Sequence, residues 1–336
     1  ILYFSLPYLL SYFLQTLYGM ADLFIIGQYE GVASTTAVSI GSQVMHMITV
    51  MIVGLAMGTT VTIGRAVGAG NKRKAAQLIG NTVTLFLLGS VVLAAVLVAL
   101  VNPIVHVIST PEQAVAGART YLIICFLGIP CITAYNILAS IFRGLGDSRS
   151  PMYFIAVACV SNIALDYLFI GTLHLGPAGA ALGTTFSQLI SVVISLCVIL
   201  RRREEVRPAK ADFKPDGTAL REILSIGIPV ALQDGFIQVS FMVITVIANQ
   251  RGLTDAAAVG IVEKIISFLF LVPSSMLSTV SALGAQNIGA GKHDRVDTIL
   301  RYAIGIGVTF GTVVAIAMQF IAPSAVRPFT SDAAVV

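Results

Sequence analysis

Long runs of apolar residues, separated by short polar connections, make up most of the chain. A helix needs about 20 mostly apolar residues to cross the hydrocarbon core of a bilayer. Nine stretches meet this requirement: 1–27, 36–64, 78–101, 120–142, 152–171, 178–200, 223–248, 256–285 and 302–326. Continuous runs of this length exclude a membrane β-barrel, whose strands alternate apolar and polar residues over about ten positions. The pattern therefore predicts an all-α integral membrane protein.

Composition supports the same fold class and excludes a water-soluble globule. Of the 336 residues, 57% are hydrophobic and 11% are charged, whereas soluble domains are about one-quarter charged. The four cysteines all lie inside apolar runs without metal-ligand spacing, so we interpret them as small apolar fillers.

The distribution of lysine and arginine predicts the orientation of the helices. Sixteen of the twenty basic residues fall in the connections after the second, fourth, sixth and eighth predicted helices, and three fall on the opposite side. Short cytoplasmic loops carry an excess of Lys and Arg. We therefore expect these connections and the N-terminus to face the cytoplasm, in the plasma or inner membrane. The basic balance of the chain is a topology signal, and we expect no nucleic-acid partner.

Two halves of the chain repeat each other. The segments Ala37–Ile40 and Gly68–Gly70 recur 221 residues later as Ala258–Ile261 and Gly289–Gly291. Repeats in one order and one register indicate an internal duplication. Because an even number of helices precedes the second copy, the copies have the same orientation and are parallel repeats.

This duplication predicts the domain organisation. Residues 1–200 form an N-lobe of six transmembrane helices, 201–222 form a cytoplasmic linker, and 223–336 form a partial C-lobe of three helices. By analogy with the first copy, we expect that roughly 85 residues of the second are missing. The chain begins at Ile1 inside an apolar run, so we interpret the N-terminus as trimmed.

Acidic residues within the apolar runs are the main candidates for chemistry, since an ionisable group at membrane depth costs several kcal/mol and marks a functional site by default. In the first helix, Ser11, Gln15, Tyr18 and Asp22 are spaced 4, 3 and 4 and share one face. In the fifth helix, Asn162 and Asp166 form an i, i+4 pair. An amide and a carboxylate placed together can hold a proton or a hard cation through oxygen atoms. The alternative is that these acids only bind neighbouring helices.

Other polar and aromatic residues are weaker candidates. Thr184, Gln188, Ser191 and Ser195 repeat the 4, 3, 4 spacing in the sixth helix, although hydroxyl groups in membranes commonly serve packing. Tyrosine rings can bind organic cations through their faces, or can simply pack at the membrane interface. The tyrosines considered for such a pocket are Tyr18, Tyr135, Tyr153 and Tyr167. Asp234, Glu263, Lys264 and His46 are the remaining ionisable residues within helices, with structural roles preferred.

Sequence motifs of enzymes are missing from the chain. It contains no Walker loop, no H-E-x-x-H, no G-x-S-x-G and no paired C-x-x-C. We therefore expect a protein that is not an enzyme and that needs no cofactor.

Four sequence blocks together resemble one known family. The blocks are Pro7 through Leu14-Gln15-Thr16 to Asp22, then Gly64–Gly70, then Phe142–Asp147 with Pro151 and Asn162-x-x-x-Asp166, and Ala285–Gly291. In this order, on a duplicated six-helix pattern, they are similar to the prokaryotic multidrug and toxic compound extrusion (MATE) transporters over essentially the whole chain.

The resemblance implies twelve helices in two lobes around a central cleft, and export of organic cations in exchange for protons or sodium. It implies a coupling site for H⁺ or Na⁺ at the positions Asp22, Asn162, Asp166 and Thr184. It also implies a helix bend at Pro7. The substrate-path candidates are Gln15, Tyr18, Tyr135, Tyr153 and Gln188.

We therefore predict a secondary antiporter that exports organic cations by alternating access. A flippase of the same superfamily, which moves lipid-linked oligosaccharides, is the nearest rival hypothesis. Such a protein would line its cleft with arginines that bind pyrophosphate, whereas here most of the arginines fall in predicted cytoplasmic connections. A non-transporting membrane scaffold would not need buried acids, and a channel would need a filter motif, which is not visible in the sequence.

Overall fold

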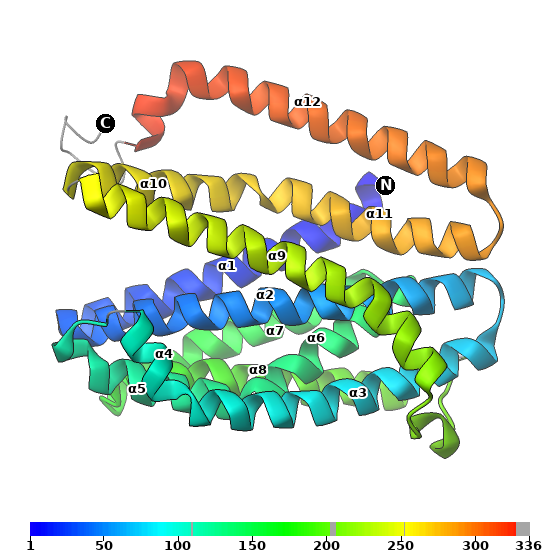
Figure 1. Ribbon diagram of the computed structural model, residues 1–336, viewed down its shortest axis with the longest axis horizontal. Helices are drawn as coiled ribbons and strands as arrows, with labels where there is room; N and C mark the ends of the chain where they lie inside the picture. The colour runs from blue at the N-terminus through cyan, green and yellow to red at the C-terminus, as the bar shows by residue number, and fades with distance from the viewer. Residues whose placement is uncertain (109, 202–205, 252, 327–336) are drawn as a thin grey trace.

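The computed structural model describes residues 1–336 except 109, 202–205, 252 and 327–336, and these described residues form a bundle of long helices (Figure 1). In chain order the elements are α1 (Leu2–Tyr29), α2 (Val32–Gly68), α3 (Lys72–Ala99), α4 (Val101–Val107), α5 (Glu112–Leu127), α6 (Ile129–Gly144), α7 (Arg149–Asp166), the π-helix η1 (Tyr167–Thr172), α8 (Gly176–Arg201), the 3₁₀ turn η2 (Lys210–Phe213), α9 (Gly217–Arg251), α10 (Leu253–Leu269), α11 (Leu271–Gly289) and α12 (His293–Val326).

The predicted membrane helices are confirmed for the described residues. Eight stretches are long and apolar enough to cross a bilayer, and the bent pair α5–α6 supplies a ninth. The pair bends by 48° at Gly128, where Pro130 at the start of α6 lacks the N–H that would continue the helix. Hydropathy alone did not predict this break, because both halves are equally apolar.

Several helices are longer than the apolar runs that predicted them. The second helix continues to Gly68, and α9 begins at Gly217 rather than at residue 223. These extensions carry charged side chains, which are compatible with a helix that projects into water but not with a hydropathy window. The connections between α2 and α3 and between α11 and α12, and the start of α9, lie together at one end of the bundle (Figure 1). The clustering agrees with the predicted common side for the basic connections.

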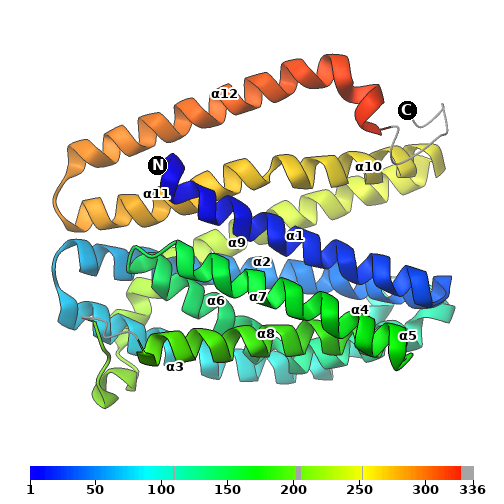
Figure 2. The ribbon, with the colours of Figure 1, turned by 180° about the vertical axis from the view of Figure 1, so that it is seen from behind.

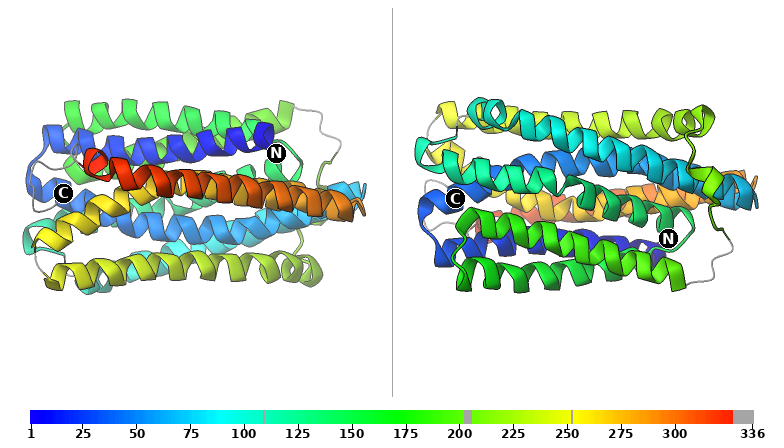
Figure 3. Two further views of the ribbon diagram at one scale, coloured as in Figure 1. Left: turned by 90° about the horizontal axis from the view of Figure 1, so that it is seen from above. Right: turned by 90° about the horizontal axis from the view of Figure 1, so that it is seen from below.

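The helices form two packed groups. Helices α1 to α8 pack among themselves, α9 lies along α2, and α11 contacts both α1 and α2. From behind, α1 crosses diagonally between α7 and α11 (Figure 2). The last helix, α12, packs on α11 and lies at the outside of the bundle, as the views from above and below also show (Figure 3).

The two groups meet through a contact that repeats the internal duplication. A side chain at Gly68 would collide with the carbonyl oxygen of Gln286, and a side chain at Gly289 would collide with the carbonyl oxygen of Arg65. Gly68 and Gly289 are 221 residues apart, as are Arg65 and Gln286. The ends of α2 and α11 therefore touch backbone to backbone in a reciprocal way, as in a two-fold symmetric interface. Only glycine permits helices to approach this closely.

The connection between α8 and α9 is held against α3 by polar contacts. Arg73 of α3 forms an ion pair with Asp212 at 2.7 Å, and the same carboxylate accepts a hydrogen bond from the backbone N–H of Ala209 at 2.7 Å. The amide of Asn81 donates to the carbonyl of Asp212 at 3.1 Å and accepts from the N–H of Asp216 at 2.7 Å. Residues 206–216 are thus docked, whereas residues 202–205 of the predicted linker lie outside the described residues.

We predict that Gly289→Val destabilises the protein. The added side chain would force α11 away from α2, and overpacking of a tight contact costs about 1–3 kcal/mol. The measurement is the midpoint of thermal unfolding in detergent. Gly305→Val is the matched control, because a side chain at Gly305 meets no atom within 4 Å. Equal midpoints for the two variants would contradict the reciprocal contact.

We predict that Asp212→Asn releases the connection from α3. The hydrogen bond from Ala209 and then the Arg73 guanidinium lower the pKa of the Asp212 carboxyl. The stabilisation is therefore present above the ordinary carboxyl pKa of about 3.9 and is lost as the pH falls through the lower folded-state pKa. At neutral pH, trypsin should cleave the variant faster than the wild type after Lys210, the site that precedes Ala211 in this connection. Asp294→Asn should not change the cleavage rate, and a rate unchanged in Asp212→Asn would show that the ion pair does not hold the connection.

Candidate functional site

The four predicted coupling residues lie together around the carboxylate of Asp22. Asp22 lies in the last third of α1, Asn162 and Asp166 lie at the end of α7, and Thr184 lies in α8. The side chains that act directly on Asp22 are Asp166, Asn162 and Thr184. Asp22 is 4% exposed and Asp166 is fully buried. The predicted cluster is thus a real cluster in space, inside the first group of helices.

The hydrogen bonds in this cluster are incomplete. The hydroxyl of Thr184 donates to Asp22 Oδ2 at 3.2 Å. Among the described residues, the other oxygen of Asp22, both oxygens of Asp166 and both amide atoms of Asn162 are buried without a hydrogen-bond partner. Buried polar atoms are normally satisfied, and each exception needs an explanation. Two carboxylates and an amide oxygen facing one another are suited to a bound proton or a hard cation.

Local backbone features bring Asp166 to this position. A side chain at Gly183 would collide with Asp166 Oδ1, so the glycine of α8 makes room for the carboxylate. Directly after Asp166 the chain forms the π-helix η1. Such π-helical turns are rare and occur frequently at functional sites. Nothing in the residue pattern predicted the π-helix, which leaves the apolar run uninterrupted.

Tyr121 is a neighbour of the cluster that the residue pattern did not reveal. This tyrosine of α5 is 2% exposed. It lies within range of an electrostatic interaction with Asp22 and beside Cys125. Its ring packs on Gly41 of α2, where a side chain would collide with it. Tyr121 sits within an apolar run with no polar stripe around it, so periodicity gave no signal.

The substrate-path candidates occupy different environments. Gln15 interacts with the hydroxyl of Tyr18, and Gln188 is 4% exposed with its amide oxygen unpartnered among the described residues. Tyr135 is buried and donates to the carbonyl of Pro151 at 3.4 Å, which uses its hydroxyl within the first group of helices. Tyr153 is 61% exposed. Their role in a substrate path stays a prediction.

The remaining ionisable candidates lie outside this cluster. Glu263 of α10 accepts a hydrogen bond from Thr245 of α9 at 2.7 Å, and Asp234 lies against Gly54 of α2. The side chains of His46, in α2, and Lys264, in α10, are exposed on the surface of the helices. Pro7 lies inside α1, whose helical assignment runs from Leu2 to Tyr29; the helix bend expected at Pro7 stays a prediction.

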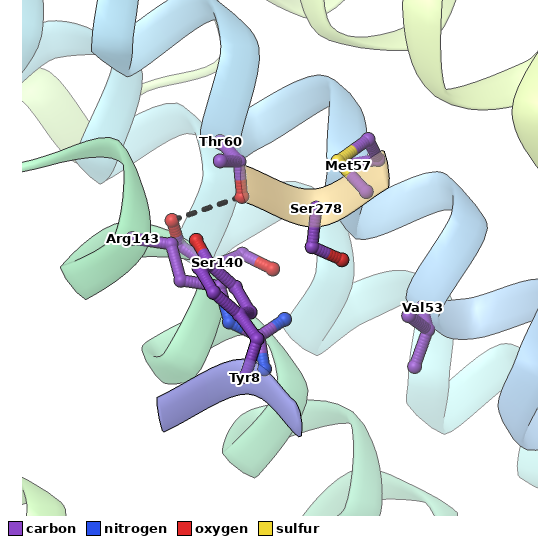
Figure 4. Close-up of a pocket in the computed structure, with 7 residues that line it drawn as sticks. All are labelled: Tyr8, Val53, Met57, Thr60, Ser140, Arg143 and Ser278. Carbon is purple, nitrogen blue, oxygen red and sulfur yellow. Dashed lines mark hydrogen bonds between the residues drawn. The ribbon is translucent and has the colours of Figure 1, made fainter. Parts of the chain in front are cut away.

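The structure corrects the assignment of Arg143 to a cytoplasmic connection. Arg143 belongs to the last turn of α6, and its guanidinium lies 5.1 Å from the ring centroid of Tyr8. Figure 4 shows it in a pocket whose lining residues come from α1, α2, α6 and α11. Hydropathy misplaced this residue because the apolar run ends at residue 142, one residue before the arginine.

Taken together, the described residues define a class of protein. They form a polytopic helical membrane bundle with a buried pair of acids between helices, an architecture that is typical of membrane transporters. No group of three or more His, Cys, Asp or Glu residues in the described part of the chain is arranged to hold a metal ion.

Comparison with known proteins identifies the family. The profile of the MatE family matches residues 7–168 and 229–336, which is most of the chain and falls in both repeats. The chain therefore belongs to the MatE family of multi-pass membrane transporters.

Curated relatives carry transporter names. The chain is 29% identical over 321 residues to the probable multidrug resistance protein YoeA of Bacillus subtilis, covering 93% of this chain and 69% of that protein. It is 28% identical to the probable multidrug resistance protein NorM of Thermotoga maritima, covering 98% and 71%. It is also 25% identical to a protein of Shewanella oneidensis named FAD transporter, covering 98% and 73%.

Solved structures share the fold. A MOP superfamily transporter from Pyrococcus furiosus, described as having a binding pocket of reverse polarity, superposes with a TM-score of 0.90 at 25% identity, covering 98% of this chain and 74% of that one. A MATE structure in the bent conformation gives a TM-score of 0.90 at 25% identity, covering 98% and 73%.

We predict that Gly183→Ala weakens cation binding at the acid cluster. The methyl group would displace the Asp166 carboxylate, and a strained buried contact of about 1–3 kcal/mol corresponds to roughly a five- to 150-fold loss of affinity. The measurement is the proton or sodium concentration that gives half-maximal transport. Gly19→Ala in α1 is the control, because its side chain would meet no atom within 4 Å. The same loss in both variants would contradict a role of Gly183 in placing the carboxylate.

Proposed function

We propose that the protein is an ion-coupled antiporter that exports small organic cations across a cell membrane by alternating access. The observation that carries this proposal is the pair of buried acids, Asp22 and Asp166, three of whose four carboxylate oxygens have no hydrogen-bond partner among the described residues. The names of the relatives YoeA and NorM support multidrug efflux as the activity.

The acid pair supports coupling to a cation. Two carboxylates in an apolar bundle repel each other and lose their hydration, so binding of a proton or a sodium ion between them is favourable. Asn162 and the hydroxyl of Thr184 supply further oxygen atoms for a sodium ion, or hydrogen bonds for a protonated pair. A cation taken up here neutralises the charge that otherwise attracts a cationic cargo.

Alternating access is supported by the arrangement of the two repeats. The ends of α2 and α11 contact each other at the end of the bundle that carries the basic connections. If that end is cytoplasmic, as the basic residues predict, this conformation is closed towards the cytoplasm. A coupling ion needs only a different affinity for the two states to drive the change between them.

A flippase for lipid-linked oligosaccharides receives less support. Pyrophosphate recognition calls for several convergent arginines, and among the described arginines only Arg143 lines the pocket between the two groups of helices. A scaffold without transport activity gives no reason for a pair of unsatisfied buried acids.

We predict that ion-driven export requires Asp22. In inverted membrane vesicles, uptake of a fluorescent organic cation is measured under an imposed pH gradient and, separately, under a sodium gradient. Asp22→Asn should lower the driven flux by about tenfold or more, because a hydrogen bond to a charged group contributes about 1.5–3 kcal/mol. Asp255→Asn, an exposed acid at the start of α10, is the control. Full driven flux in Asp22→Asn would overturn the proposal.

A further inference from the structure

A second group of unsatisfied polar atoms lies away from the acid pair. Among the described residues outside the cluster around Asp22, Tyr8 Oη and Arg143 Nε are both buried without a hydrogen-bond partner, and these two residues are neighbours, with the guanidinium 5.1 Å from the Tyr8 ring centroid. Tyr8 is 2% exposed. The proposed antiport mechanism uses neither residue.

The pocket around this pair is lined by both repeats. Tyr8, Val53, Met57, Thr60, Ser140 and Arg143 come from α1, α2 and α6, and Ser278 comes from α11 (Figure 4). The space is too narrow to admit a water molecule, so it is closed in this conformation. The contacts that close it join the two groups of helices. The hydroxyls of Tyr12 and Ser278 lie 2.8 Å apart, and the amide of Gln286 donates to the carbonyl of Gly144 at 2.9 Å.

The charge of the pocket is positive and uncompensated. No acidic residue of the described part of the chain lines it, and among the described residues the Arg143 guanidinium has no ion pair and instead faces the Tyr8 ring. Neighbouring hydroxyls are already engaged: Thr60 donates to the carbonyl of Ser140 at 3.1 Å. A partly buried cation without a counter-ion is costly, and the face of an aromatic ring offsets this only in part.

We propose that Arg143 and the hydroxyl of Tyr8 form a binding site for the carboxylate of a zwitterionic cargo molecule, which is exposed when α11 separates from α1 and α6. The planar guanidinium presents paired N–H donors that match the two oxygens of a carboxylate, and the Tyr8 hydroxyl supplies a third donor. The cationic group of the same molecule is left for the buried acid pair, Asp22 and Asp166. This inference rests on the proposed function, because it assigns a part of the cargo to a residue.

The test compares two dyes that differ only in the carboxylate. A zwitterionic rhodamine with a free carboxylate and its methyl ester, which is a plain cation, are assayed for transport in vesicles by wild type and variants. Arg143→Gln should raise KM for the carboxylate dye by about tenfold or more, as expected for the loss of charge-assisted hydrogen bonds, and leave KM for the ester unchanged. Tyr8→Phe should have a smaller effect of the same kind. Arg149→Gln is the control, since Arg149 also stacks on a tyrosine, Tyr3, at 4.8 Å.

Equal losses for the two dyes would overturn the inference, because Arg143 would then only position the helices; the proposed function would stand. Arg143→Lys, which keeps the charge, and Tyr8→Phe decide the question if Arg143→Gln does not fold.

If the wild type transports neither dye, the proposed function fails, and equilibrium binding of the two dyes to protein in nanodiscs tests the site independently. Wild-type binding of the carboxylate dye that Arg143→Gln weakens supports the site. Unchanged binding of the carboxylate dye in Arg143→Gln contradicts a cargo site. If the variant loses only co-purified phosphatidylglycerol, the cargo site is also contradicted, and Arg143 instead binds a lipid phosphate.

Discussion

The burial of two carboxylates within an apolar helical bundle is the constraint on which the rest of the structure depends. An uncompensated charge in such surroundings costs several kcal/mol, which is the physical reason for the proposal that Asp22 and Asp166 share a cation. The neighbouring features are explained by this demand: Gly183 gives Asp166 room, Thr184 donates to Asp22, and a π-helix follows Asp166.

A second constraint is the reciprocal contact of the repeats. The acid pair lies towards the ends of α1 and α7 that are remote from the basic connections, whereas the contact of Gly68 and Gly289 lies beside those connections. The pocket around Arg143 belongs to the same interface between the repeats. Separation of the repeats at this interface would therefore expose a positive site, while the negative site stays within the first group of helices. A cargo with both charges fits this distribution.

The residue pattern predicted the nine membrane segments and singled out Asp22 and the pair Asn162 and Asp166, because apolar length and i, i+4 spacing are local properties. The resemblance to the MATE transporters, and not the pattern, grouped these three residues with Thr184. The pattern did not predict the break at Gly128 or the π-helix after Asp166, since neither interrupts an apolar run. It missed Tyr121, whose proximity to Asp22 arises because α1 and α5 both pack against α2 and α8. It placed Arg143 in a loop, because the end of an apolar run does not mark the end of the helix. The helix α6 continues past the apolar run and includes Arg143.

The most direct test of a shared cation site measures linkage between ion and cargo. The affinity of the purified protein for a fluorescent organic cation is determined across a range of pH and of sodium concentration, for wild type, Asp22→Asn, Asp166→Asn and the double variant. If the two acids bind one ion as a unit, each single substitution abolishes the dependence on that ion, and the double variant loses nothing further. A dependence that persists in either single variant, or that falls in two additive steps, would contradict the shared site.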